Sequence, residues 1–469
     1  MTLVAGVDSS TSATKVEVRD VDSGEVVGRG AAPHPPTQPP RSEQDPAEWW
    51  EAFESGWEQA GSPEVAAISV GGQQHGMVAL DEQREVIRPA KLWNDTESAP
   101  DAASLIERLP GGRQGWADAC GVVPVASFTI TKLAWLARNE PEAFVRLAHV
   151  VLPHDWLTFR LTGSLTTDRG DASGTGYWSA ASGSYRPELL ALVDADRDWS
   201  GAVPTVLGPG DAAGEWNGAV VGPGTGDNMA GALGVGLRSG DVAVSIGTSG
   251  TVYSVCDSPA TDPSGIVAGF ADATGRYLPL VCTLNATKVT DAAARLLGVG
   301  HAAFDELVFA APPGAGGLTL LPYLDGERTP DRPSATGVLS GVRSDVSREQ
   351  LARAAVEGVI CGLLDGLDAL AAFAPADGRL ILVGGGARSR AYRQVLADLS
   401  GRAVLVPRSD EQVATGACVQ AAAVATGADP NDVADRWKLS DGDVVEPGPA
   451  TSAADDVRAA YALLRDSIG

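Results

Sequence analysis

Two short runs of small hydroxyl residues are of a type that binds phosphate. Thr11-Ser12-Ala13-Thr14 and Thr248-Ser249-Gly250-Thr251 each lie between two strand-like apolar segments. In such a hairpin, backbone N–H groups and hydroxyls gather at a tight turn and can hold phosphate oxygens without net positive charge. Two hairpins of this kind, one in each domain, could grip one polyphosphate. Two ordinary hairpins that share a Thr/Ser turn by chance are the alternative, because short motif matches often mislead.

Asp8 and Lys15 flank the first of these turns. A carboxylate that faces a phosphate is repelled unless a cation lies between them. We therefore interpret Asp8 as organising Mg²⁺, either directly or through the water ligands of the ion. A turn-capping aspartate is the competing interpretation. Lys15 either lies near the phosphates or faces solvent from its strand.

A third small-residue element follows the apolar run Leu380–Val383. Gly384–Gly386 indicate a turn, and the residues from Ser389 onward indicate a helix with apolar side chains on one face. A strand, a glycine turn and a helix let a flat ligand approach the backbone closely. Any tight strand-to-helix turn also favours glycine, so this element alone does not identify a ligand.

The glycine-flanked segment GGQQHG (residues 71–76) has side chains that suit an uncharged polyol. Gln74 and His75 are neutral hydrogen-bonding groups on a loop between two apolar strands. A structural histidine would be the default interpretation of His75 on its own. Further candidates for lining the same pocket are Trp93, Asn94, Asp95 and Asn228.

Asp227 follows a glycine-rich loop and precedes a predicted helix, where we place it at the N-cap. Phosphorylation of a hydroxyl needs a group that accepts the proton as the phosphoryl group arrives. A plain N-cap aspartate is the commoner use of this residue type. The residues alone leave both interpretations open.

The elements that would position these groups alternate between strands and helices. The alternation of Val16 and Val18 with Lys15 and Glu17 predicts a strand, and a proline-rich loop follows it. Trp49, Trp50, Phe53 and Trp57 then recur at helical spacing, which indicates an amphipathic core helix. This order predicts an α/β fold. A second strand-rich segment begins at Val242, so we place a first domain at residues 1–240 and a second at 241–469.

Composition limits the class of protein. The 469 residues suffice for two or three domains, and the net charge of −25 gives no general attraction for nucleic acid or anionic lipid. The cysteines, scattered and odd in number, suit a reducing cytosol better than a disulfide framework or a zinc site. We find no signal peptide and no apolar stretch long enough to cross a bilayer, so we expect a cytoplasmic protein.

With these elements in order, the chain resembles the FGGY family of carbohydrate kinases over nearly its whole length. The resemblance includes both hairpins, the turn Gly384–Ala387 and LLPYLDGERTP (Leu320–Pro330), which is similar to the signature loop of the family. It implies an α/β architecture with the two-domain actin-like, ribonuclease-H-like ATPase fold and a central cleft. Within the family the chain is most similar to the kinases of D-xylulose, on the segments SEQDPAEWW, GGQQHGMVALD, RPAKLWNDT, LPHDWLTFRLTG and TTDRGDASGTGYW.

The resemblance assigns roles to the residues singled out above. It implies that Asp227 is the catalytic base, kept ionised by a helix N-terminus, and that Asp8 assists catalysis and organises Mg²⁺. The implied sugar-binding residues are Gln74, His75, Trp93, Asp227 and Asn228. The implied ATP-binding residues are Thr11, Ser12, Lys15, Gly247, Thr248, Ser249, Gly385, Gly386, Ala387 and Arg390.

The chain departs from the pattern of the family at several of these positions. Ser10 and Ala13 stand where relatives usually have glycine, so the first turn must tolerate side chains. Gln74 replaces a methionine found in many relatives. Arg390 replaces an asparagine that some relatives use near the nucleotide. The sugar and adenine contacts at the last two positions are therefore less firmly implied.

The implied activity is ATP- and Mg²⁺-dependent phosphorylation of D-xylulose to D-xylulose 5-phosphate in xylose catabolism. A kinase for ribulose, another ketose or a polyol is a close alternative. An actin- or chaperone-like ATP-driven binding protein shares the fold but would not need GGQQHG and GDN around a small pocket. A sugar sensor without catalysis conflicts with the presence of Asp8, Asp227 and both hairpins. We expect sugar and ATP as partners, no nucleic acid and no membrane, and a monomer or homodimer.

Overall fold

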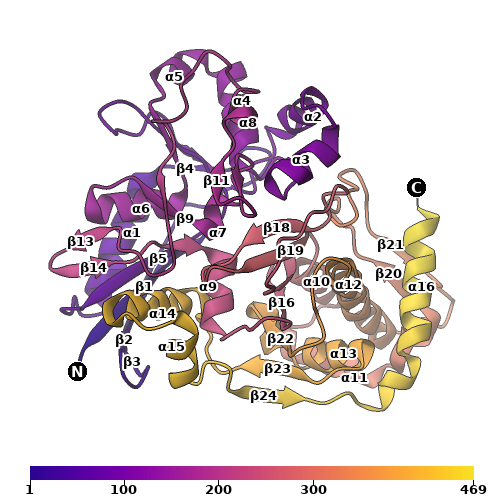
Figure 1. Cartoon of the computed structure of the whole chain (residues 1–469). Coiled ribbons are helices and arrows are strands. Elements are labelled where there is room, and N and C mark those ends of the chain that lie inside the picture. The colour runs from indigo at the N-terminus through magenta and orange to yellow at the C-terminus, as the bar shows by residue number, and fades with distance from the viewer. Residues whose placement is uncertain (469) are drawn as a thin grey trace. The chain divides into compact units, whose positions relative to one another are not determined.

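The computed structural model describes residues 1–468 and divides into two compact units (Figure 1). The first unit contains Met1–Leu237, Cys256–Leu278 and Glu411–Ser440. The second contains Arg238–Val255, Pro279–Asp410 and the chain from Asp441 onward. Two segments from the second half of the sequence therefore pack with the first unit. The boundary near residue 240 remains a prediction, because the two units exchange segments rather than meeting at one point of the chain.

The main sheet of the first unit has the strand order β13-β14-β5-β1-β2-β3, with β15 also paired to β5. Strands β1 and β2 form the antiparallel hairpin, in which Ser9 lies opposite Thr14, and β5 runs parallel to β1. The strands are β1 (Leu3–Ser9), β2 (Ala13–Asp20), β3 (Val26–Pro33), β5 (Ala67–Gly72), β13 (Gly214–Trp216), β14 (Ala219–Val221) and β15 (Thr225–Gly226). The carboxyl ends of β1 and β5 therefore meet at one edge of the sheet, beside the hairpin turn.

Helices cover both faces of this sheet, as the alternation of buried residues requires. Val7 and Val16 face a core that includes Trp49 of α1 (Pro46–Gln59) and Trp156 of α6 (Pro153–Thr162). Val4, on the opposite face, packs against α14 (Gln412–Thr426) and α15 (Pro430–Arg436). Figure 1 shows α1 and α6 on one side of the sheet and α14 on the other. The predicted amphipathic helix around Trp49 is confirmed.

The remaining elements of the first unit are short and extend around this sheet. The helices are α2 (Ala99–Arg108), α3 (Gly112–Cys120), α4 (Thr129–Asn139), α5 (Pro141–Arg146), α7 (Arg169–Ala172), α8 (Pro187–Leu190) and α9 (Asp227–Gly234). The strands are β4 (Glu43–Gln44), β6 (Val78–Leu80), β7 (Ala90–Lys91), β8 (His149–Val151), β9 (Thr166–Asp168), β10 (Trp178–Ser179), β11 (Ser184–Tyr185), β12 (Thr205–Leu207) and β18 (Ala268–Ala271).

The second unit is built on another mixed sheet, which has the order β19-β17-β16-β22-β23-β24 within this unit. Its strands are β16 (Val242–Ile246), β17 (Gly250–Ser254), β19 (Tyr277–Thr283), β22 (Leu380–Val383), β23 (Val404–Pro407) and β24 (Gly442–Val445), with β20 (Thr319–Leu321) paired to β21 (Val338–Ser340). The central pair β16 and β22 is parallel, whereas β16 and β17 form an antiparallel hairpin. The predicted strand-rich start at Val242 is confirmed.

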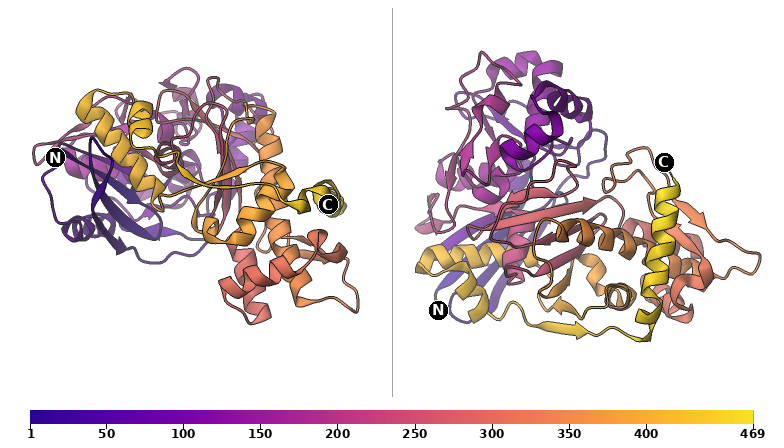
Figure 2. Two further views of the ribbon diagram at one scale, coloured as in Figure 1. Left: turned by 90° about the horizontal axis from the view of Figure 1, so that it is seen from below. Right: turned by 45° about the vertical axis from the view of Figure 1, so that its right-hand side comes forward.

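Helices of the second unit pack on and around its sheet. The long helix α12 lies against β17 and α13, and the C-terminal helix α16, yellow in Figure 2, contacts β20 and α13. The helices are α10 (Thr287–Leu297), α11 (His301–Ala310), α12 (Arg348–Ala371), α13 (Arg390–Ser400) and α16 (Ala454–Ser467). Short 3₁₀ turns lie at η1 (Pro313–Gly317), η2 (Gly385–Arg388) and η3 (Pro449–Ala453). Within residues 1–468, no helix has the length and apolar character needed to cross a bilayer.

Close contacts through glycines bring α14 against both α9 and β1. A Cβ atom at Gly416 would lie 1.8 Å from the carbonyl oxygen of Ala230, and one at Gly234 would lie 1.9 Å from that of Gln412. At Gly6 of β1 it would lie 2.1 Å from the carbonyl oxygen of Ala414. These separations leave no room for a methyl group. Glycine is therefore required wherever α14 crosses the helix that begins at Asp227.

We predict that Gly416→Ala destabilises the protein, because the new methyl group forces α14 and α9 apart. Alanine favours a helix more than glycine does, so without this clash the substitution would stabilise the protein by about 1 kcal/mol. Overpacking should reverse the sign, with a loss of roughly 1–3 kcal/mol measured by chemical denaturation. Gly201→Ala, which meets open space, is the control. A Gly416→Ala variant as stable as the control would contradict this account of the packing.

Candidate active site

The first hairpin turn encloses two residues. The backbone N–H of Ser10 donates to the carbonyl of Ala13 over 3.0 Å, which leaves Thr11 and Ser12 at the tip. None of the four residues from Ser10 to Ala13 is among the described residues that have a positive φ angle. The turn therefore accommodates the side chains of Ser10 and Ala13, as the sequence analysis predicted.

Hydrogen bonds from three directions hold Thr11. The indole N–H of Trp93 donates to its Oγ1 over 2.9 Å, and Oγ1 donates to Oε1 of Gln73 over 3.0 Å. The side-chain amide of Gln44 donates to its carbonyl over 2.9 Å. Trp93, predicted to line the sugar pocket, therefore makes its polar contact with the first hairpin turn.

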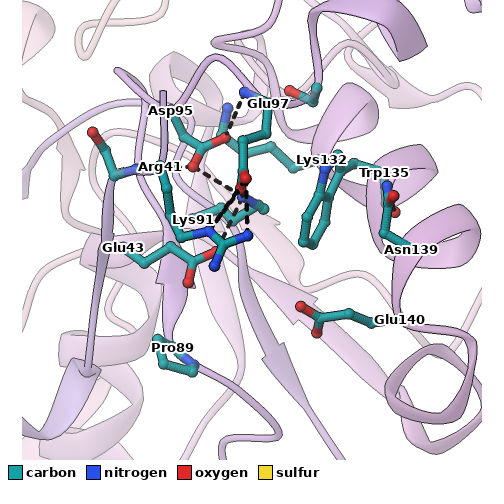
Figure 3. Close-up of polar contacts among 12 residues, drawn as sticks. Arg41, Glu43, Pro89, Lys91, Asp95, Glu97, Lys132, Trp135, Asn139 and Glu140 are labelled. Carbon is teal, nitrogen blue, oxygen red and sulfur yellow. Dashed lines mark hydrogen bonds and ion pairs between the residues drawn. The ribbon is translucent and has the colours of Figure 1, made fainter. Parts of the chain in front are cut away.

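A dense cluster of ion pairs holds the segment that carries Trp93 (Figure 3). The buried ammonium of Lys91 lies 2.8 Å from Glu97, 2.9 Å from Asp95 and 3.0 Å from Glu43. These three carboxylates are close enough together to bind a metal ion. Lys91 takes that place, and its Nζ also lies 3.9 Å from the ring centroid of Trp135. Asp95, predicted as a pocket residue, therefore contributes to this cluster.

Asp8 lies at the end of β1 with Lys15 across the hairpin. Its Oδ2 is 3.7 Å from Nζ of Lys15, and that ammonium is 2.5 Å from Oε2 of Glu411, just before α14. Burial raises the pKa of Asp8 to about 6 although the charge of Lys15 lowers it. The other oxygen, Oδ1, is buried and has no hydrogen-bond partner among the described residues. An additional ligand, such as a water bound to Mg²⁺, fits this orphaned oxygen.

Gln74 and His75 follow the end of β5 and are buried. His75 adopts a left-handed backbone conformation, with φ of 62°, which is unusual for a residue with a side chain. Its backbone N–H donates to Oδ1 of Asp171 over 3.2 Å, and its carbonyl accepts from Thr129 over 3.1 Å. A Cβ atom at Gly174 would lie 1.8 Å from the imidazole ring. The surrounding structure thus holds His75 in a conformation that the local sequence does not favour.

The side chain of Asn228 links Asp227 to Gln74. The side-chain amide of Asn228 donates to Oε1 of Gln74 over 2.6 Å and to Oδ1 of Asp227 over 2.9 Å. Gly226 is the N-cap of α9, and Asp227 is its first helical residue, so the predicted N-cap position is wrong by one residue. The structure therefore brings together three of the predicted sugar-site residues.

The pKa of Asp227 moves in the direction opposite to that expected from a helix N-terminus. Burial, followed by the charges of Asp171 and Asp8, raises it to about 7, against hydrogen bonds from Asn228 that lower it. Desolvation and like charges therefore outweigh the helix dipole. A carboxyl group with a pKa near neutrality is suited to take up a proton at physiological pH.

Sequence reasoning missed two charged residues at this site. Glu411 lies 396 positions from its partner Lys15, and no local pattern signals such a pair. Asp171 lies inside TTDRGDASGTGYW, one of the segments that carry the family resemblance, but its contact with His75 follows from tertiary packing.

Counted between the last paired residues of the strands, the hairpin of the second unit has a shorter turn than the first, in which Ser9 pairs with Thr14 and four residues lie between them. Ile246 pairs with Gly250, which leaves Gly247, Thr248 and Ser249 in the turn. Backbone N–H groups at the start of α10 donate to the carbonyls of Gly247 and Thr248 over 2.9 and 3.2 Å. The repeated phrase therefore forms a hairpin in each unit, but the two turns differ by one residue.

The predicted adenosine turn follows β22 directly. Gly384 has a φ of 84°, and a Cβ atom there would lie 2.7 Å from the carbonyl oxygen of Ile246. A Cβ at Gly386 would lie 2.4 Å from the Ile246 side chain, whereas one at Gly385 meets open space. Gly384 and Gly386 therefore serve packing, and Gly385 leaves the backbone open to a ligand.

Arg390 begins α13 on the exposed side of this turn. Its guanidinium pairs with Glu306 over 3.0 Å and lies over the ring of Phe309, with 5.3 Å to the centroid. Its backbone N–H donates to Asp305. Ala387, in contrast, is buried. The side chain of Arg390 is thus held by α11.

Sequence profiles of the FGGY family of carbohydrate kinases match most of the chain. The N-terminal domain matches residues 3–234 and the C-terminal domain matches residues 242–425. The chain is 50% identical over 456 residues to the xylulose kinase of Streptomyces rubiginosus, covering 95% of this chain and 92% of that protein. It is 36% identical to the xylulose kinase of Escherichia coli, over 85% and 84% of the two chains.

Solved structures show the same similarity. The crystal structure of xylulose kinase from Bifidobacterium adolescentis has a TM-score of 0.87 at 44% identity and covers 99% of both chains. That of a xylulose kinase from Brucella ovis has a TM-score of 0.91 at 30% identity, also over 99% of both. The predicted actin-like, ribonuclease-H-like two-domain fold is confirmed. The chain belongs to the FGGY family of carbohydrate kinases.

Proposed function

We propose that this protein transfers the terminal phosphoryl group of ATP to D-xylulose and forms D-xylulose 5-phosphate, a step of xylose catabolism. D-Xylulose is proposed as the sugar because the chain is 50% identical to a xylulose kinase over 95% of its length. Membership of a carbohydrate kinase family supports ATP as the phosphoryl donor. A cytoplasmic location and a monomeric or homodimeric state remain part of the proposal.

Asp227 is proposed as the general base for the sugar hydroxyl. Its carboxyl group is fixed by Asn228, and its raised pKa lets it hold the proton that the hydroxyl loses. Because phosphoryl transfer has a loose transition state, positioning and charge stabilisation contribute more than strong basicity. The proton thus moves from the hydroxyl to a carboxylate oxygen as the new O–P bond forms, while the bond from the γ-phosphorus to the bridging oxygen breaks and ADP leaves.

Gln74, His75 and Asn228 are proposed to bind the hydroxyl groups of the sugar. All three present neutral amide or imidazole groups, which suits a substrate without charge. The hydrogen bond from Asn228 to Gln74 links the sugar residues to the base. Trp93 is assigned to holding Thr11 rather than to contact with sugar, because its indole N–H donates to that hydroxyl.

Thr11 and Ser12, and the turn Gly247–Ser249 in the second unit, are proposed to bind phosphate oxygens through backbone N–H groups and hydroxyls. Asp8 would hold Mg²⁺ through its orphaned oxygen, and this ion would offset the charge of the phosphates. Lys15 lies beside both Asp8 and Glu411, where it neutralises carboxylates and can also face a phosphate. Gly385, Gly386 and Ala387 are proposed to bind adenosine. Arg390 is proposed to lie at the rim of the adenosine site.

The choice of sugar is tested with purified protein, ATP, Mg²⁺ and a panel of ketoses and polyols, with ADP release as the measurement. We expect D-xylulose to give the highest kcat/KM, at least about tenfold above D-ribulose, since one unsatisfied buried hydroxyl contact lowers specificity by that much or more. A preference for ribulose or a polyol would reassign the substrate. ATP hydrolysis that no sugar stimulates would contradict the proposed activity altogether.

The proposed base predicts how activity depends on pH. A carboxyl group with a pKa near 7 is protonated below that value and cannot accept a proton, so kcat/KM for the sugar should fall as pH drops below 7. The loss should approach roughly tenfold per pH unit, the factor by which the ionised fraction falls. Asp227→Asn should lower kcat by about 10²–10⁴-fold and abolish this dependence. A flat profile in the wild-type protein from pH 5.5 to 8 would identify another base.

The second hairpin can be tested by adding bulk to its turn. A Cβ atom at Gly247 would lie 3.4 Å from its nearest neighbour, the carbonyl oxygen of Ser249, so the fold can accept it. We expect Gly247→Val to lower kcat by at least about tenfold, the loss typical of a displaced phosphate contact. Sugar affinity in the absence of nucleotide and the melting temperature should stay close to wild type. Full turnover in this variant would exclude close approach of a phosphate to Gly247.

A further inference from the structure

His154, the second residue of α6, has no solvent exposure and lies among three buried aspartates. Its Nε2 is 3.1 Å from Asp155, 3.4 Å from Asp171 and 3.5 Å from Asp168. Asp155 and Asp171 are fully buried, and Asp168 is 3% exposed. Of these residues, only Asp171 was described above, as a neighbour of His75 and Asp227. The cluster nevertheless lies within one contact of the proposed sugar site.

The imidazole of His154 supplies the positive charge of this cluster. Burial lowers its pKa, but the charges of Asp155, Asp171 and Asp168 raise it to about 9, so the ring is protonated at neutral pH. Among residues 1–468, the ion pairs of these three carboxylates are all made with histidines: His154 for each, and His75 in addition for Asp171. Buried carboxylates that lack a cation take up protons and lose their hydrogen-bond acceptors. The positive charge of His154 lowers the pKa values of Asp155 and Asp171, although burial and neighbouring carboxylates still leave both raised, at about 7.

Two of the three aspartates reach the proposed sugar site directly. Oδ1 of Asp171 accepts the backbone N–H of His75 over 3.2 Å and also lies 3.5 Å from its ring. Oδ2 of Asp168 accepts the hydroxyl of Thr225 over 2.6 Å, two residues before Asp227. One aspartate thus holds the strained loop at His75, and the other holds the turn that leads into Asp227.

His154 also packs against both of these segments. A Cβ atom at Gly72, the last residue of β5, would lie 2.9 Å from Cβ of His154. A Cβ atom at Gly224, in the loop before Asp227, would lie 2.6 Å from its Nδ1. Gly224 has a φ of 75°, which favours glycine in any case. His154 therefore contacts β5, the loop before Asp227 and both linking aspartates.

We propose that His154, as an imidazolium, is a positioning residue for the kinase reaction: its charge holds Asp171 and Asp168, which orient His75 and the turn before Asp227. The inference rests on the proposed roles of His75 and Asp227. The proposed role requires a positively charged side chain at position 154. A role in packing alone would require only a side chain of similar size and shape. These two requirements can be separated by substitution.

The test compares His154→Gln, which removes the charge, with His154→Lys, which keeps it. We expect His154→Gln to raise KM for the sugar and to lower kcat, each by at least about tenfold, because two elements of the site lose their anchors. Affinity for a fluorescent ADP analogue should change by less than about threefold, since the proposed adenosine residues lie in the other unit. His154→Lys should restore sugar KM to within about fivefold of wild type. His149→Gln, a partly exposed histidine before α6, is the matched control.

Asp171→Asn provides a second route to the same question if His154→Gln does not fold, because it keeps the histidine and removes one link. It should raise sugar KM by a similar factor and leave the affinity for the ADP analogue unchanged. A folded His154→Gln protein with wild-type sugar KM would overturn the proposal. So would a His154→Lys protein as impaired as His154→Gln, or an Asp171→Asn protein with unchanged sugar KM. A wild-type protein inactive on every sugar would instead reject the proposed function.

Discussion

The candidate site of the first unit depends on bringing several carboxylates together in a buried place. Asp8 and Asp171 both raise the pKa of Asp227, and burial acts on all three in the same direction. Such a concentration of negative charge is costly unless cations lie among the carboxylates. The fold places Lys15 beside Asp8 and His154 beside Asp171. Lys15 thus offsets the negative charge of Asp8, and His154 offsets that of Asp171, on two sides of the proposed base.

Close backbone packing is what allows these charged groups to converge. Helix α14 approaches β1 and α9 through Gly6, Gly234 and Gly416, where a methyl group would meet a carbonyl oxygen. The same helix begins just after Glu411, the partner of Lys15. One helix from the last part of the chain therefore holds the strand that ends at Asp8 and the helix that begins at Asp227. Its small residues serve the site although none of them is proposed to touch a substrate.

The second unit uses its glycines for two different purposes. Gly384 and Gly386 let the turn after β22 lie against Ile246 of β16, whereas Gly385 has open space beside it. The turn Gly247–Ser249 is held by backbone hydrogen bonds from the start of α10. Its backbone groups can thus be placed accurately without a charged residue. This agrees with the net charge of −25 and with phosphate binding by local dipoles.

Local patterns in the sequence determined the elements and most of the proposed site. Strand alternation, turn residues and the GGQQHG and GDN segments are short-range signals, and the hairpins, the Gly384–Gly386 turn and the Gln74–Asn228 contact agree with them. Only the tertiary structure decided where charges pair: Lys15 with Glu411, His154 with Asp171, and α14 with the first unit. It also reversed the expected pKa shift of Asp227. The physical reason is that secondary structure follows from neighbouring residues, whereas burial and charge pairing depend on atoms that the chain brings together from distant positions.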